Sequence, residues 1–331
     1  MIESGIQRVK VPRVQIDGVL LLDKPLGLSS NDALMRVKRI TRALKLGHGG
    51  TLDPLATGLL PIAFGEATKF LQGMLDANKT YLADIKFGET TTTADREGEI
   101  IEAKPVTHDE VALIACLKTF EGAHSQVPPM YSALKHEGTP LYKLARSGID
   151  VARAARDITI FAIELLEFTA ETAKLRVACS KGTYIRTLAE DIGKALGCGA
   201  HLAGLRREQV TGFHLQDALT LEQVQNQIDD SSFVTSLLPT DAMISSIPRF
   251  ELDQVLAQRM MQGQRLRLSN TTTTGKVRMY FGETLLGLGS IDNGVLSPLR
   301  LIQFSQSALS NLSLSLPSIE TKPAAQKALV H

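Results

Sequence analysis

Apolar and polar positions follow both strand and helix periods along this chain, in no regular order. The segment YLADIKFG (81–88) alternates, so that every second residue from Tyr81 to Phe87 lies on one side of a strand. The segment TYIRTLAEDIGKALG (183–197) instead repeats apolar residues at helical spacing from Ile185 onwards. Because no regular βαβ order emerges, we predict an α+β fold with a mixed, mainly antiparallel sheet.

The N-terminal part shows the same mixture. The pattern predicts a strand within DGVLLLDKPLG (17–27) and a helix over SSNDALMRVKRITRALKLG (29–47). Either Ser29 or Ser30 caps this helix, and Gly47 ends it.

Three further elements are predicted between residues 107 and 180. The segments ITIFAIELLEF (158–168) and KLRVACS (174–180) are typical of strands. THDEVALIACLKTFEG (107–122) is typical of a helix, in which Thr107 and Glu110 have the spacing of a capping box.

The periodicity changes at three places that divide the chain. An insertion at about 125–150, rich in Pro and Gly, is long for a plain loop, and such insertions are usually functional or disordered. A second change near residue 246 separates a first domain, 1–246, from a small β-rich module at 247–304, with a hairpin in GKVRMYFGETLLGLGSI (275–291). The Ser-rich tail at 305–331 is expected to be disordered.

Composition fits an ordinary globular protein. The 331 residues are 44% hydrophobic and 21% charged, with a formal net charge of +1, so overall charge indicates no partner. The three cysteines follow no framework, which favours a reducing compartment. The first residues contain no apolar stretch of the signal-peptide kind, and no apolar run approaches the ~18 residues of a membrane span. We expect a cytoplasmic protein.

The sequence lacks the motifs of several common enzyme classes. The sequence has no GxxxxGK[ST] phosphate loop, no HExxH metal pattern, no GxSxG elbow and no cofactor fingerprint. What remains is Asp53, a lone carboxylate in the glycine-rich stretch GHGGTLDP (47–54). Taken by itself, an Asp-Pro pair is more typical of a turn than of a catalytic site.

Basic residues gather in three places. The first cluster lies in the predicted N-terminal helix (Arg36, Lys38, Arg39, Arg42, Lys45). The second is the pair Arg206 and Arg207, and the third alternates with tyrosines in the 125–150 insertion (Tyr131, Lys135, Tyr142, Lys143, Arg146). Each is compatible with a solvated surface, but basic groups mixed with aromatics also suit RNA.

The stretch GHGGTLDPLATGLLPIAFGEATKF (47–70) resembles the catalytic motif of the TruB family, the bacterial tRNA pseudouridine-55 synthases. Five other stretches resemble the same family in the same order, and together the resemblance covers roughly residues 18–304. They are VLLLDKPLGLSSND, KTYLADIKFGETTTTAD, QVPPMYSALKHEGTPLYKLARSG, CSKGTYIRTLAEDIG and CGAHLAGLRRE.

The resemblance implies which residues form the site. It makes Asp53 the catalytic carboxylate, Arg186 its cationic partner, and Tyr81 a ring that stacks on the uracil and helps to remove its C5 proton. It also implies that His48, Tyr184 and Leu205 contact the substrate. Arg186 could instead pair with Glu190 one helical turn away, and Tyr81 could be an ordinary core residue.

The resemblance also implies a function. Uridine at position 55 in the TΨC loop of tRNA would be flipped out and isomerised to pseudouridine, with no cofactor and no metal. Residues 1–246 would form the catalytic domain, with a thumb-like insertion over the RNA, and 247–304 a PUA-like RNA-binding module. We expect a monomer that needs no protein partner. The alternatives are a tRNA-folding chaperone, with catalysis secondary, and the related catalytic subunit of guide-RNA complexes.

One position departs from the family pattern. Gly49 stands where family members usually carry Thr. If the backbone there keeps a negative φ, we expect Gly49→Thr to be tolerated and slightly stabilising, because Gly loses more conformational freedom on folding.

Overall fold

The computed structural model describes residues 12–132, 134–269 and 271–304. The chain divides into two compact units, with the boundary between Met243 and Ile244. The expected disordered tail, 305–331, lies outside the described residues. Within the described ranges, no helix is both long and apolar enough to cross a membrane.

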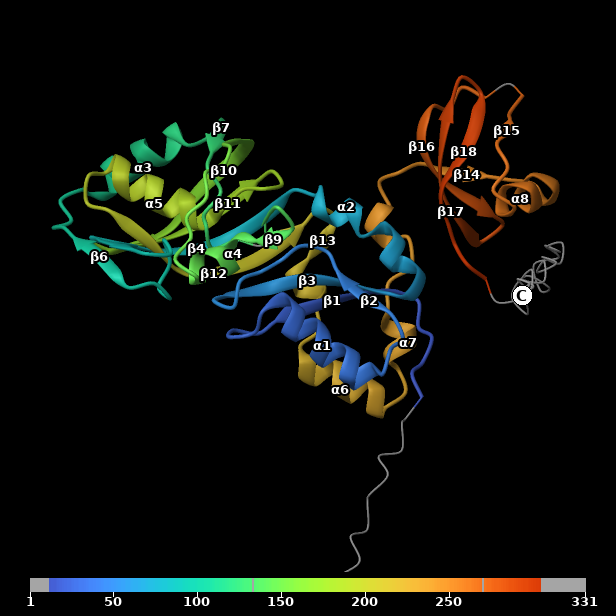
Figure 1. Ribbon diagram of the computed structural model, residues 1–331, viewed down its shortest axis with the longest axis horizontal. Coiled ribbons are helices and arrows are strands. Elements are labelled where there is room, and N and C mark those ends of the chain that lie inside the picture. The colour runs from blue at the N-terminus through green and yellow to red at the C-terminus, as the bar shows by residue number, and fades with distance from the viewer. Residues whose placement is uncertain (1–11, 133, 270, 305–331) are drawn as a thin grey trace, which may run out of the picture. The chain divides into compact units, whose positions relative to one another are not determined.

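The first unit is built on a nine-stranded sheet (Figure 1). Its main path runs, in spatial order, through β1 (Gly18–Lys24), β3 (Ala56–Phe64), β12 (Ala200–Val210), β4 (Lys79–Phe87), β11 (Thr172–Cys179), β10 (Arg156–Phe168) and β7 (Gly122–Gln126). β2 (Leu46–His48) pairs with β3, and β13 (Phe213–His214) pairs with β12. β3 and β12 run parallel and the other pairs antiparallel. The prediction of an α+β fold with a mainly antiparallel sheet is confirmed.

The remaining elements of this unit are short strands and helices. Two small hairpins pair β5 (Glu89–Thr91) with β6 (Ile100–Ala103), and β8 (Lys135–His136) with β9 (Thr139–Pro140). The helices are α1 (Ser30–Thr41), α2 (Gln72–Leu75), α3 (Glu110–Thr119), α4 (Leu141–Arg146), α5 (Ile185–Ala195), α6 (Leu221–Asp229) and α7 (Phe233–Ser236).

Two apolar clusters hold the sheet to its helices. One joins β4, β10, β11 and β12 to α3 and α5, and includes the fully buried Leu113 and Ile192. The other joins β1 and β3 to α1 and α6, and includes Val37 and Val224.

The first helix is shorter than predicted. It begins after Ser29, whose side chain accepts from the Asp32 backbone, but it ends at Thr41 instead of Gly47. Arg42 takes a left-handed conformation with φ 54°, and Ala43 then bridges to Val14. The following residues, Leu46–His48, become β2 because pairing with β3 outweighs their helical pattern.

Other local predictions have mixed outcomes. The predicted capping box at the start of α3 is wrong, because Asp109 is the N-cap and accepts from the Ala112 backbone. The alternation in 81–88 is confirmed, since Tyr81, Ala83, Ile85 and Phe87 are the buried positions of β4.

The second unit is a small β-rich module. Its sheet contains β14 (Arg249–Glu251), β15 (Leu266–Arg267), β16 (Gly275–Phe281), β17 (Thr284–Asp292) and β18 (Val295–Leu301), packed against α8 (Gln254–Met261). The hairpin predicted in 275–291 is confirmed by the antiparallel pairing of β16 with β17.

Candidate active site

Asp53 lies in the glycine-rich loop, residues 49–55, between β2 and β3. The loop is fixed at both ends: the Gly49 amide donates to the Pro61 carbonyl at 2.8 Å, and the Ala56 amide to the Asp53 carbonyl at 3.0 Å. In its middle, the buried Ser30 hydroxyl accepts from the Leu52 amide at 2.7 Å and donates to the Leu52 carbonyl at 3.0 Å. The first residue of α1 therefore anchors the loop beside Asp53.

Arg186 reaches this loop from the first turn of α5. Its Nη2 forms an ion pair with Asp53 Oδ2 at 2.9 Å, and its Nη1 forms one with Asp95 Oδ2 at 3.2 Å. A cation in the first turn of a helix opposes the helix dipole, and two carboxylates offset this cost. Arg186 thus pairs with Asp53 and Asp95, and not with Glu190, the alternative partner.

Asp95 is the partner that the sequence did not reveal. It is 2% exposed, and its Oδ1 accepts from the Thr93 hydroxyl at 2.5 Å and from the Glu97 amide at 3.0 Å. These bonds fix Asp95, which in turn holds Arg186 toward Asp53. Asp95 closes one of the stretches that carry the family resemblance, but nothing in its local pattern marks it as buried.

Burial raises the pKa of Asp53 above its ordinary value, and the neighbouring Asp95 adds to this effect. The positive charge of Arg186, together with that of Lys24, opposes the rise without cancelling it. The Asp53 side chain keeps 40% of its exposure because it faces an open cavity. The site thus holds a carboxylate that is reachable by a ligand, with its negative charge balanced mainly by one fixed cation.

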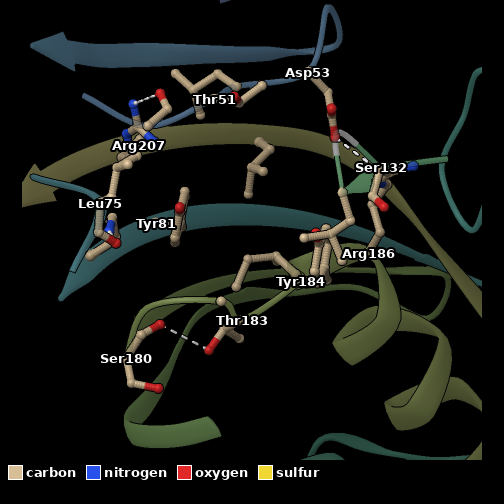
Figure 2. Close-up of a pocket in the computed structure, with 17 residues that line it drawn as sticks. Thr51, Asp53, Leu75, Tyr81, Ser132, Ser180, Thr183, Tyr184, Arg186 and Arg207 are labelled. Carbon is tan, nitrogen blue, oxygen red and sulfur yellow. Dashed lines mark hydrogen bonds and ion pairs between the residues drawn. The ribbon is translucent and has the colours of Figure 1, made fainter. Parts of the chain in front are cut away.

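The cavity has a volume of about 510 Å³ and is lined in part by the neighbouring strands β4 and β12. Figure 2 shows Asp53 and Arg186 on one side of it, and Arg207 with Tyr81 on the other. Tyr184 and Leu205 also line it. The structure therefore brings five of the six predicted site residues to one cavity: Asp53, Tyr81, Tyr184, Arg186 and Leu205.

Tyr184 is placed by a residue at the end of β7. The side-chain amide of Gln126, 6% exposed, accepts from the Tyr184 backbone N–H at 2.8 Å and donates to its carbonyl at 3.1 Å. Tyr184 is the N-cap of α5, which has no side-chain cap of its own. Gln126 therefore fixes the helix start that carries Arg186.

His48, the sixth predicted residue, lies at the end of β2 and lines a neighbouring cavity of about 480 Å³. Asp53 and Arg186 line that cavity as well, so the two hollows share the ion pair as a common wall. Burial, and secondarily the charge of Arg207, lower the pKa of His48, which favours the neutral ring. A neutral imidazole is suited to stacking against a base.

The three predicted basic clusters differ in their exposure to solvent. On α1 and just after it, Arg36, Arg39, Arg42 and Lys45 are exposed, as are Lys135, Lys143 and Arg146 in the insertion. The pair Arg206 and Arg207 is not a surface cluster, because strand alternation turns them to opposite faces. Arg206 pairs with Asp23 at 2.7 Å, whereas Arg207 is 1% exposed.

The insertion, called here the thumb-like segment (125–150), contributes both side chains and backbone to the site. It contains the β8–β9 hairpin and α4, and the Arg146 guanidinium lies 5.7 Å from the Tyr142 ring centroid. The Tyr131 carbonyl accepts from Arg186 Nη2 at 2.6 Å. The cation of the ion pair is thus bonded to the thumb-like segment as well as to Asp53.

Gly49 corrects one expectation. Its φ lies outside the left-handed region, but a Cβ added there would lie 2.6 Å from the Met74 Cβ, a main-chain-attached atom with little freedom to move. A side chain added at this position would force Met74 of α2 to shift. The expectation that Gly49→Thr stabilises the protein is therefore wrong on steric grounds.

Within the described ranges, no group of three or more His, Cys, Asp or Glu side chains is placed to hold a metal ion.

Lys24 is another buried charged residue near the site. It is 0% exposed and donates to the carbonyls of Pro25 and Leu28. Burial lowers the pKa of Lys24 to about 8, although Asp53 opposes the shift.

Three family models match the chain in succession. A TruB family pseudouridylate synthase N-terminal domain matches residues 38–185, a tRNA pseudouridylate synthase B C-terminal domain matches 186–245, and a Pseudouridine synthase II TruB C-terminal domain matches 248–302. Their junctions lie near the unit boundary and at the start of α5.

Curated relatives are similar over almost the whole chain. A tRNA pseudouridine synthase B of Burkholderia lata is 52% identical over 91% of this chain and 95% of its own length. One of Cupriavidus metallidurans is 53% identical over 91% and 98%. Among solved structures, a Cbf5-Nop10-Gar1 complex matches with a TM-score of 0.67 and 26% identity, over 86% of this chain and 84% of that one.

Proposed function

This chain belongs to the TruB family of pseudouridylate synthases, and from that premise we propose where it acts and which side chains act. It is an isomerase that converts uridine in tRNA to pseudouridine. We propose that the target is uridine 55 in the TΨC loop and that the base is flipped into the cavity beside Asp53. The observation that carries this proposal is the Asp53–Arg186 ion pair, open to a cavity lined by Tyr81.

The reaction breaks the bond between N1 of uracil and C1′ of the ribose, turns the base, and joins C5 to C1′. Asp53 is the carboxylate that acts close to the ribose. Its side chain faces the cavity, and Arg186 balances its charge. Tyr81 stacks on the base and receives the C5 proton. Tyr184 and Leu205 complete the walls around the uracil.

Recognition of the RNA surrounds this cavity. Extracting a base from a folded loop costs a few kcal/mol, which contacts around the loop must recover. His48, at the wall shared by the two cavities, is suited to fill the space that the base leaves. We assign the thumb-like segment (125–150) and the exposed cations of α1 to the TΨC arm, and the β-rich module (247–304) to further RNA contact as a PUA-like domain.

The tRNA-folding chaperone alternative is not favoured by family membership, and the candidate catalytic residues are present. We further propose that the protein acts as a monomer in the cytoplasm, without a protein partner. Light scattering of the protein, free and with tRNA, tests the monomer: a mass above one chain per tRNA contradicts it.

An unmodified tRNA transcript tests the function as a whole. Incubation with the purified protein should give pseudouridine at position 55, without added metal or cofactor. A matched transcript with cytidine at that position should remain unmodified. Pseudouridine elsewhere in the transcript, with none at position 55, would contradict the assigned target.

A further inference from the structure

Arg207 and Tyr81 are direct neighbours across two strands of the sheet. In the antiparallel pairing of β12 with β4, Arg207 stands opposite Tyr81. Opposite residues of antiparallel strands project from the same face of the sheet, and here both line the cavity of Asp53. Figure 2 shows them together on the side away from the Asp53–Arg186 pair.

The Arg207 guanidinium is held by neutral groups. Its Nε donates to the Leu59 carbonyl at 2.7 Å and its Nη2 to the Gly50 carbonyl at 3.2 Å. Within the described ranges it forms no ion pair with a carboxylate. Leaving a buried cation without a counter-ion costs free energy, so its location requires an explanation other than stability.

The Tyr81 hydroxyl is the group that this charge faces. Burial raises the pKa of the Tyr81 phenol, whereas the charge of Arg207 and a hydrogen bond from it oppose the rise. The Tyr81 side chain is 9% exposed, so the two groups interact out of bulk water. A fixed cation in such surroundings stabilises negative charge on the phenol oxygen more than solvent-exposed cations do.

The same guanidinium also joins three separate segments. It donates to β3 through the Leu59 carbonyl and to the glycine-rich loop through the Gly50 carbonyl, and its charge acts on Tyr81 of β4. The backbone of Arg207 is fixed as well, because it pairs with Gly58 of β3 and with Tyr81 of β4. Arg207 therefore fixes the Tyr81 hydroxyl relative to the loop that carries Asp53.

We propose that Arg207 is a positioning residue for the isomerisation: it orients the Tyr81 hydroxyl toward the turned base and stabilises the phenolate that takes up the C5 proton. This inference rests on the proposed function. It assigns no contact between Arg207 and the substrate; its effect passes through Tyr81.

The last step of the reaction moves one proton away from C5. After C5 has joined C1′, C5 still carries its hydrogen, and the ring has a double bond between N1 and C6. The C5–H bond breaks, its proton passes to the Tyr81 phenolate oxygen, and its electron pair forms the C5–C6 double bond. The N1–C6 electron pair moves to N1, which takes a proton from solvent. The phenol proton returns to solvent before the next turnover.

Two variants of Arg207 test the proposal in the full-length protein. Arg207→Met removes the charge and its donors, and Arg207→Lys keeps the charge with fewer donors. Arg176→Met is the matched control: Arg176 lies in the same sheet, but its neighbour Val177 is the residue that pairs with Tyr81, so Arg176 projects from the opposite face. Thermal melts and tRNA affinity are measured first, to show that each variant is folded.

Single-turnover rates are then compared on transcripts whose target uridine carries hydrogen or deuterium at C5. Arg207→Met should be at least about 100-fold slower than wild type, the lower end of the range for lost acid–base assistance. Its hydrogen-to-deuterium rate ratio should rise, because C5 proton removal becomes slower. Arg207→Lys should recover part of the rate, and Arg176→Met should match wild type in both measurements.

A slower Arg207→Met with an unchanged isotope ratio would overturn the proposal, as would an unchanged rate. If neither Arg207 variant folds, Tyr81→Phe decides. Loss of the hydroxyl should lower the melting temperature by leaving Arg207 donors unpaired, and an unchanged melting temperature would overturn the proposal. A wild-type protein that forms no pseudouridine on the same transcript would instead contradict the proposed function.

Discussion

Arg186 and Arg207 line the same cavity, but their positive charges are balanced in opposite ways. Arg186 lies between two carboxylates, Asp53 and Asp95. Arg207 is bonded to two carbonyls and faces a phenol, with no carboxylate beside it among the described residues. The Arg186 side thus has an excess of negative groups, and the Arg207 side has an unbalanced positive charge.

The difference matches what each side of the cavity is proposed to do. A carboxylate that acts at the sugar needs a counter-charge that lowers its pKa, and Asp95 keeps that counter-charge in place. A tyrosine that takes up a proton must do so as the phenolate, which needs a cation not already neutralised by another group. Both arginines bond the glycine-rich loop, Arg186 through Asp53 and Arg207 through Gly50, and Arg186 also bonds the thumb-like segment through Tyr131.

Arg186→Met should have the largest effect. It leaves Asp53 and Asp95 without their shared cation, and breaking a buried charge pair costs about 3–5 kcal/mol of stability. Pseudouridine formation should be lost together with this stability. Urea unfolding of the variant, with Arg176→Met as the control, measures the cost. A loss no larger than that of Arg207→Met would contradict the contrast between the two arginines.

Asp95→Asn should have the next largest effect. It keeps the Asp53–Arg186 pair but removes the charge that holds Arg186 from behind. The single-turnover rate should fall about 10–100-fold, equivalent to ~1.4–2.7 kcal/mol in barrier, while tRNA affinity remains. A rate like that of wild type would show that Asp53 alone positions Arg186.

Gly49→Thr tests the loop that links the two sides. The added Cβ meets Met74 at 2.6 Å, so overpacking should destabilise the protein by about 1–3 kcal/mol. Gly47→Ala is the control, because its Cβ would meet only the flexible Leu71 Cδ1. Melting temperatures of the two variants decide the point. A Gly49→Thr protein as stable as wild type would mean that α2 moves freely.

The smallest effect concerns the stability of Asp53→Asn. Because the pKa of Asp53 is raised in the folded state, the wild type loses stability as pH rises from about 3.8 through that raised value. Asparagine has no such dependence, so the variant should gain stability over wild type between pH 4 and pH 7. Urea unfolding at both values measures this, and a relative loss at pH 7 contradicts the raised pKa.

The site could be predicted from sequence where a motif carried it. The resemblance supplied Asp53, Tyr81 and Arg186, and the structure brings them to one cavity. Asp95 had no local signal, because its burial depends on contacts with Thr93 and Glu97 in a turn.

The place of Arg207 on the cavity face follows from strand alternation. Arg207 stands two residues after Leu205 in a strand, so alternation places both on one face. The charge pattern instead suggested a surface pair with Arg206. The end of α1 could not be predicted for a different reason: Arg42 carries no stop signal, and tertiary pairing of Ala43 and β2 decides where the helix ends.

Pseudouridine formation by Asp53→Asn tests the central claim most directly. The substitution keeps the shape of the side chain and removes the charge that faces Arg186. The variant should bind the tRNA transcript like wild type and form no pseudouridine at position 55. Turnover within about tenfold of wild type, a barrier change of only ~1.4 kcal/mol, would contradict the assignment of Asp53 as the reacting carboxylate.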